Sequence, residues 1–375
     1  MSHIWSIDRS SFLHSLLYSF FFVFTFFGSS LSAQERAIHH GPIGVTGEHY
    51  HKKNGVMISI RQMRMLMGDN RDGTKDLSDA EVIELDNPYY MGDMSTKLSV
   101  VPKKMLMDMT MLGAMYAPSD SLSLMGMMML TNKKMDLNTY QGVMSMNGMM
   151  MNQAMTNRAK LGLFTTSAFG LSSLSVSGLI KLYEINHARL HAELGMQRSI
   201  GESDVMDEVL TPMNMRQDMI LPYGMQIGDR STSLIAGLTY VHEFHSFVYG
   251  NQLRLKNKFQ HDLWSFGDTL SLTGWVQKEL SRKTSLSLRI AHHSQGTIKG
   301  RNSLIMAPVQ TANPENYGGK IIELSVGINQ LLNIFPGNHS DRIGLEVTHP
   351  VYQNLNGPQM KHGLSINLGY QKSLK

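Results

Sequence analysis

The chain has 375 residues, among them 33 glycines, 31 methionines and no cysteine, and 17% of its residues are charged. The lack of cysteine excludes disulfides, thiolate zinc sites, iron–sulfur clusters and a cysteine nucleophile. The formal net charge is +4, but the lysines and arginines are scattered singly, so the sequence predicts no nucleic-acid partner. A mean hydropathy of -0.17 fits a soluble domain and also a membrane barrel, whose strands alternate apolar and polar residues.

The first segment carries Arg9, an apolar run over residues 16–27, and the small residues Ser32 and Ala33 before a charged stretch. This order is typical of a secretory signal peptide, which we place at residues 1–33. An uncleaved anchor is the alternative interpretation. After Ala33 no run of about 18 apolar residues occurs, so we expect no transmembrane helix there. Export then leads to the periplasm, the outer membrane or the medium.

Residues 34–54 precede the first predicted strand and contain His39, His40, His49 and His51 together with a proline and several glycines. This composition is typical of a mobile segment, so we expect a histidine-containing periplasmic lead that behaves as a solvated tether. Imidazoles also accept copper or zinc. The four histidines are therefore candidate metal ligands.

Strand-type alternation recurs over residues 55–375. Ile366 and Leu368, for example, share one face of a predicted strand, while Ser365 and Asn367 share the other. By this criterion the chain contains about twelve strands. They begin near Val56, Lys104, Ser121, Ser172, Ala188, Arg230, His245, Asp268, Lys283, Lys320, Arg342 and Gly363.

The connections between these strands alternate in length. Short links follow the even-numbered strands, as at residues 117–120, and long links follow the odd-numbered strands, as at residues 131–171 and 199–229. A soluble sandwich has no reason to sort its connections in this way. The sequence therefore predicts an all-β fold, a single antiparallel transmembrane β-barrel with long extracellular loops and short periplasmic turns.

Charged side chains fall on the polar face of the predicted strands, and in a barrel this face lines the lumen. Both signs occur, so we expect weak ion selectivity. The candidate lumen residues are Arg61, Arg189, Glu193, Arg289, Glu323 and Glu346.

Most of the methionines lie between Met57 and Met155, and several recur at spacing two, which places each set on one face of a strand. Polar neighbours predict that these faces look into the lumen. The direction of the second set is less clear, because Asp108 and Thr110 lie opposite it and a carboxylate in lipid is costly; we place it inward. The sets are Met63, Met65 and Met67, then Met105, Met107, Met109 and Met111, and then Met125, Met127 and Met129.

Two interpretations of these methionines stay open. Flexible, polarizable methionine is suited to lining an adaptable apolar channel. Alternatively, thioethers select Cu(I), and a cysteine-free route avoids thiol oxidation, which predicts a Met/His-rich barrel that binds or transports copper. In that case a loop cluster captures ions outside and the four histidines of the lead receive them inside. The cluster comprises Met144, Met146, Met149, Met150, Met151 and Met155.

An outer-membrane enzyme is a third alternative, for which His292, His293 and Ser294 are the candidates. No serine sits in a Gly-x-Ser-x-Gly elbow, and nothing in the sequence marks an oxyanion hole. The sequence therefore predicts that the protein is not an enzyme.

Five stretches carry a resemblance to a bacterial family: residues 39–45, 49–53, 115–120, 306–314 and 350–359. They resemble the outer-membrane proteins of the family named "MetA-pathway of phenol degradation", which are often labelled as transporters. The resemblance implies a Gram-negative outer-membrane barrel with a transport role and no catalytic residues. Two positions depart from the family. Residues 164–177 lack an expected Gly-Asp pair, and Lys375 stands where a terminal aromatic is usual, so Tyr370 must serve in the assembly signal.

These observations predict an outer-membrane channel or transporter for small solutes. Hydrophobic or aromatic compounds are the class that an adaptable methionine lining favours. The expected partners are outer-membrane lipid, the small-molecule solute and the outer-membrane assembly machinery. Copper is the one cofactor or cargo that the sequence suggests, under the second interpretation of the methionines.

Overall fold

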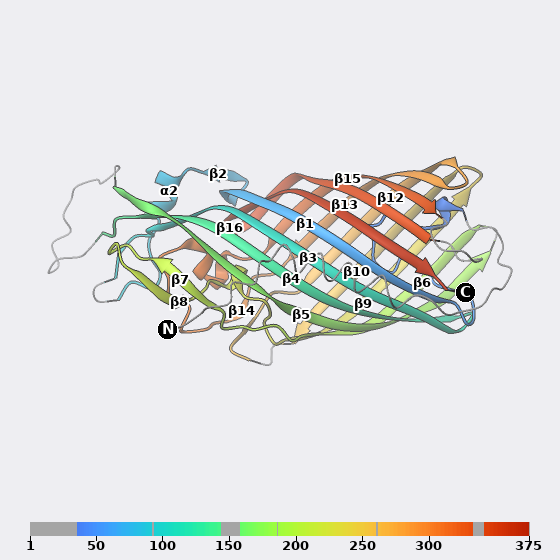
Figure 1. Cartoon of the computed structure of the whole chain (residues 1–375), viewed down its shortest axis with the longest axis horizontal. Helices are drawn as coiled ribbons and strands as arrows, with labels where there is room; N and C mark the ends of the chain where they lie inside the picture. Colours follow the sequence, from blue (N-terminus) through green and yellow to red (C-terminus); the bar gives the residue numbers. More distant parts are fainter. Residues whose placement is uncertain are drawn as a thin grey trace, which may run out of the picture.

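The computed structural model describes residues 36–91, 94–143, 158–185, 187–259, 262–332 and 341–374. The predicted signal peptide and the methionine cluster at residues 144–155 lie outside the described residues. Long antiparallel strands dominate the described part (Figure 1). They are β1 (Val56–Gly73), β3 (Val100–Ser119), β4 (Leu122–Tyr140), β5 (Lys160–Ile185), β6 (Ala188–Ser199), β9 (Thr232–Phe244), β10 (Phe247–Phe259), β12 (Thr269–Ser281), β13 (Thr284–Gln295), β15 (Gly319–Leu332) and β16 (Asp341–Ser373).

These strands form one sheet that closes on itself. Its order is β16-β15-β13-β12-β10-β9-β6-β5-β4-β3-β1, and β16 returns to pair with β1. The short β2 (Lys75–Leu77) pairs with the far end of β1 as an extra strand. The predicted all-β antiparallel barrel is thereby confirmed, with eleven strands in the ring and one beside it.

The strand β16 doubles back on itself. It has 33 residues, and a straight strand of that length would reach about 110 Å, far beyond its neighbours. Its first part pairs with β15 and its second part with β1. Side chains join the two parts: the Tyr370 hydroxyl donates to Asp341 at 2.7 Å, and Gln353 Nε2 donates to the backbone oxygen of His362 at 2.8 Å. The two passes correspond to the strands predicted near Arg342 and Gly363.

The outer and inner faces of the sheet differ in chemistry, because successive side chains of a strand point to opposite faces. In β15, Leu324, Val326 and Ile328 are exposed on the outer face, whereas Ser325 and Asn329 are buried on the inner face. An apolar outer face around a polar interior is the pattern of a barrel that sits in lipid.

The connections are sorted between the two ends of the barrel, as the sequence predicted. The links β3–β4, β5–β6, β9–β10 and β12–β13 are short and lie at one end, the turn end. Longer connections lie at the opposite, loop end (Figure 1). They carry α2 (Asp79–Ile83), β7 (Met206–Leu210), β8 (Arg216–Ile220), β11 (Trp264–Ser265), β14 (Lys299–Gly300) and the 3-10 turns η2 (Tyr223–Met225), η3 (Gln310–Ala312) and η4 (Pro314–Asn316). None of the helices in the described residues has the length and apolarity needed to cross a membrane.

The strands β4 and β5 reach further toward the loop end than predicted. β5 begins at Lys160 rather than near Ser172, and much of the predicted loop at residues 131–171 is strand. Polar residues on the outer face, such as Asn132 and Lys134, hide the alternation there. Backbone pairing nevertheless continues, with Asn132 opposite Phe169. The predicted loop at residues 199–229 likewise contains the β7–β8 hairpin.

Candidate functional site

The segment before β1 fills the barrel at the turn end, and we call residues 36–55 the plug. It begins at the β12–β13 turn, where Ala37 N donates to Arg282 O at 2.9 Å, and it includes the 3-10 turn η1 (Ala37–His39). It reaches the opposite wall where Lys53 N donates to Asp120 Oδ1 at 2.9 Å. Between these points Ile43 is only 2% exposed. The expectation of a mobile, solvated lead is therefore wrong: the segment is packed inside the lumen.

Side chains of the barrel strands form hydrogen bonds with the backbone carbonyl oxygens of the plug. A buried carbonyl oxygen without a hydrogen-bond partner is costly, so a segment crossing a lumen needs donors from the wall. Inward-facing side chains of β6, β10 and β12 fill this role. The pairs are His191 Nε2 with the oxygen of Gly47 at 2.8 Å, Gln252 with that of Thr46 at 2.9 Å, and Gln277 with that of His40 at 2.7 Å.

Arg342 at the start of β16 anchors the middle of the plug and is 1% exposed. Its Nη1 lies 3.2 Å from the Glu48 carboxylate and 2.7 Å from Gln371 Oε1, and its Nη2 donates to Gly41 O. Burial alone would raise the pKa of Glu48, but the charge and hydrogen bond of His49 and the charge of Arg342 together lower it below its ordinary value. Glu48 therefore stays ionised and holds the guanidinium in place.

The plug passes over a second buried ion pair. Arg289 Nη2 lies 2.8 Å from Glu346 Oε1, and the two side chains are 7% and 0% exposed. Gly44 crosses this pair so closely that a Cβ atom there would lie 2.1 Å from Glu346 Oε1. Glycine is the residue that fits this crossing without a shift.

The structure places the six predicted lumen residues on the inner face, and opposite charges join several of them. Besides the Arg289–Glu346 pair, Glu193 lies 2.8 Å from Arg254, and Glu323 lies 3.5 Å from His293. The interior is therefore mixed in sign and largely paired. The remaining two are Arg61, which donates to the Thr46 hydroxyl of the plug at 3.3 Å, and Arg189, which shares the β6 face of buried His191.

The three residues suggested as an enzyme site do not come together. His292 and Ser294 take the outer face of β13 and His293 the inner face, because strand neighbours alternate. His293 Nδ1 instead lies 2.9 Å from Ser271 Oγ, and its Nε2 faces Glu323. This Ser–His–Glu row comes from three different strands, so local sequence spacing cannot show it.

Methionines of β1, β3 and β4 meet on one inner surface, which we call the methionine surface. Met63 pairs with Met109 and Met65 with Met107 across β1 and β3. The second set thus shares the inner face, while Asp108 points outward and pairs with Arg64 at 2.7 Å. Further members are Met57, Met67, Met105, Met111, Met115, Met125, Met127, Met129 and Met135, joined through the β1–β3 and β3–β4 registers.

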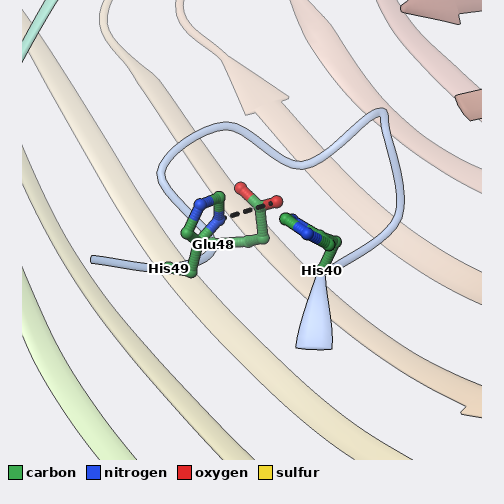
Figure 2. Close-up of side chains that lie close together, drawn as sticks. All are labelled: His40, Glu48 and His49. Atoms are coloured by element: carbon green, nitrogen blue, oxygen red, sulfur yellow. Dashed lines mark ion pairs between the residues drawn. The ribbon is translucent and has the colours of Figure 1, made fainter. Parts of the chain in front are cut away.

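All four candidate histidines belong to the plug, one at its rim and three further inside the barrel. His39 Nε2 lies 3.5 Å from Glu243 at the turn end. The other three form a row, with ring centroids 5.4 Å apart for His40 and His49 and 4.8 Å apart for His49 and His51. Glu48, which the sequence did not single out, lies between His40 and His49 (Figure 2).

Apolar side chains close the loop end, and we call their cluster the loop cap. Tyr223 and Trp264 are almost fully buried in it, with ring centroids 4.8 Å apart. Met105 and Met135 of the methionine surface belong to the same cluster. A small cavity of about 50 Å³ lies beside it. Its wall includes Val100, Met135, Leu137, Phe164, Leu221, Ala307 and Val309.

Sequence reasoning missed the residues that hold the plug. Glu48 and Arg342 are separated by nearly the whole chain, and neither belongs to a local motif. The one available signal was strand alternation, which puts Arg342 on the same face as Glu346. A buried arginine on a lumen face needs a carboxylate or carbonyl partner, and the lead was the segment free to supply one.

Solved structures with a similar fold include the COG4313 outer membrane channel from Pseudomonas putida F1. It is 10% identical to this chain, the match covers 88% of this chain and 98% of that chain, and the TM-score is 0.53. The chain has the closed antiparallel β-barrel fold of outer-membrane proteins. A FadL homologue from Pseudomonas aeruginosa is 8% identical, with 92% and 98% of the two chains covered and a TM-score of 0.41. No family model and no curated protein matches the sequence, so the resemblance to the "MetA-pathway of phenol degradation" family stays a prediction.

Proposed function

We propose that this protein is an outer-membrane channel for small solutes that its own plug and loop cap hold closed. The plug is the observation that carries the proposal. It fills the lumen through hydrogen bonds and ion pairs to several strands, whereas the barrel wall is a separate, closed hydrogen-bonded ring. The plug can therefore leave its position without opening the sheet. No enzymatic reaction forms part of this proposal.

The apolar composition of the loop cap favours hydrophobic compounds as the solutes of the channel. The cavity beside it is walled by aliphatic, aromatic and methionine side chains. Its volume is about 50 Å³, whereas a dry cavity that holds benzene measures about 150 Å³. Entry of a small aromatic molecule therefore requires the cap to move. Below the cap, the methionine surface offers a flexible apolar wall along one side of the lumen.

Planar-bilayer conductance tests the plug. Arg342→Gln removes the guanidinium that joins Glu48, Gln371 and the Gly41 carbonyl, so we expect more frequent and longer openings than in the native chain. Arg64→Gln is the matched control, because Arg64 also pairs with a carboxylate but on the outer face. Both variants must show the gel shift of a folded barrel. Equal conductance of the native chain and Arg342→Gln would contradict a gate at the plug.

Solute uptake into liposomes tests the cap. Ala307→Phe fills the cavity and should slow the uptake of a small aromatic compound while leaving that of a small sugar unchanged. The control is Leu163→Phe, since Leu163 neighbours Phe164 in sequence but is 55% exposed on the outer face. Aromatic uptake that is equally fast in Ala307→Phe and the native chain would argue against this route.

Fractionation tests the location. An apolar outer face around a paired polar interior belongs in lipid, so the protein should sediment with outer membranes. Recovery in the soluble periplasm would exclude the outer-membrane assignment.

A further inference from the structure

Three side chains of the plug converge inside the barrel. His40, Glu48 and His49 each offer one ligand atom, and these atoms lie within 4.8 Å of one another (Figure 2). His40 is 5% exposed and Glu48 6% exposed, and the His49 side chain is 10% exposed. Such a group of two imidazoles and a carboxylate at one point is a ligand set suited to a transition metal.

The two ring nitrogens of His49 have different surroundings. Its Nδ1 lies 3.0 Å from Glu48 Oε1. Its Nε2 is buried and has no hydrogen-bond partner among the residues that the structure describes. Nδ1, the nitrogen that faces Glu48, is therefore the one that can share an ion with the carboxylate. Arg342 fixes the Glu48 carboxylate from behind, as an outer partner of a metal ligand does.

The charges around the cluster discriminate between ions. Arg342 pairs directly with Glu48, and the buried guanidinium of Arg61 faces Glu48 and Glu346. Each further positive charge placed here is repelled by these two arginines in a medium of low dielectric constant. A monovalent ion therefore suffers less repulsion than Zn²⁺ or Cu²⁺. Neutral imidazoles and thioethers both suit Cu⁺.

The methionine surface extends to the part of the plug that contains Glu48 and His49. Tyr50, the residue after His49, packs against a buried cluster formed by Met57, Met115, Met125 and Leu179. The Cε of Met125 lies 3.9 Å from the position a Cβ would take at Gly47. Thioether groups thus continue from the wall of the lumen to the edge of the imidazole cluster.

From these contacts we propose that the plug binds a single Cu⁺ ion through His40, Glu48 and His49, and that the methionine surface supplies weaker thioether sites beside it. His39 at the rim is outside the ligand set. The site does not depend on solute conduction, because its ligands all belong to one segment of the plug.

Competition with a Cu⁺-selective chelator, under ascorbate, measures the binding in the purified full chain. The native protein should hold one tightly bound equivalent, and its X-ray absorption spectrum should show nitrogen or oxygen ligands. In His40→Gln and His49→Gln the affinity should fall by about 10–100-fold or more, since even outer partners of metal ligands contribute that much. His242→Gln is the matched control, because His242 lies beside Tyr240 on the outer face of β9.

Several results would overturn the site. They are a native chain that binds no more Cu⁺ than His49→Gln, a first equivalent with sulfur ligands alone, and tighter binding of Zn²⁺ than of Cu⁺. The spectrum of the native chain decides the ligand type even where a variant fails the gel-shift test for a folded barrel. Because conductance is not measured, failure of the channel proposal would leave these outcomes unaffected.

Discussion

Gly44 has no Cβ atom, and this allows the plug to lie directly over the Arg289–Glu346 pair. Gly44→Ala would put a Cβ atom 2.1 Å from Glu346 Oε1, and Arg289 holds that carboxylate in place. Overpacking of this kind costs about 1–3 kcal/mol. We expect the plug to shift and bilayer openings to become more frequent.

Gly126→Ala is the control for this change, since a Cβ there meets nothing within 4 Å. Limited proteolysis should cleave the plug faster in Gly44→Ala than in Gly126→Ala. Identical cleavage and conductance in the two variants would show that the crossing at Gly44 does not hold the plug.

The ionisation of Glu48 makes the anchor dependent on pH. Its pKa in the folded chain is depressed below the ordinary 4.5, against the effect of burial, by His49 and Arg342. A depressed pKa gives stability that is fully present above the ordinary value and is lost as the pH falls toward the folded value. The charged and titratable groups that act on Glu48 are His40, His49, Arg61 and Arg342.

We therefore expect the closed state to persist from about pH 7 to pH 5 and to weaken only below about pH 4.5, where the unfolded carboxyl binds protons. Open probability in bilayers, measured against pH, checks this. In Glu48→Gln the acid-induced rise should disappear and openings should be frequent at neutral pH. A native channel that opens between pH 7 and pH 5 would assign the gate to other groups.

At the scale of a strand, the methionine surface can be altered without changing its shape. Met63, Met65 and Met67 replaced together by leucine keep volume and apolarity, and such exchanges usually cost less than about 1.5 kcal/mol each. We expect conductance and barrel stability to change little, whereas the sulfur signal of Cu⁺ bound beyond the first equivalent should weaken without vanishing, because the methionines of β3 and β4 remain. A large loss of stability, or an unchanged sulfur signal, would contradict this reading of β1.

The strands were largely predictable, and the plug was not. In β15 and β16, apolar and polar residues alternate along the sequence. Because successive side chains point to opposite faces, this alternation identifies the lipid-facing and inward-facing residues of each strand. The upper parts of β4 and β5 were missed where outer-face polar residues interrupt that pattern. The plug has neither alternation nor helical period, and its burial depends on donors such as Gln252 and Gln277 that lie far away in the sequence.

At the scale of the whole molecule, the lumen has paired charges rather than a ring of one sign. Glu193 faces Arg254, and Arg289 faces Glu346. Channels select strongly when charges of one sign line the constriction, so openings of Gly44→Ala should discriminate weakly between small cations and anions. Reversal potentials in a salt gradient measure this. Near-ideal selectivity for either sign would mean that these pairs separate when the plug moves.

The closure of the sheet by β16 on β1 also governs the order of events during folding. Met57 pairs with Ser373, and Leu374 N donates to the oxygen of Val56, so the seam joins the two extremes of the described chain immediately beside the plug. Contacts between such distant residues form late, because the entropy of closing so long a loop must first be overcome. The Arg342 anchor belongs to the same final hairpin. The plug therefore acquires its Arg342 anchor only when the last hairpin arrives, so zipping of the seam and final seating of the plug should occur in one kinetic phase.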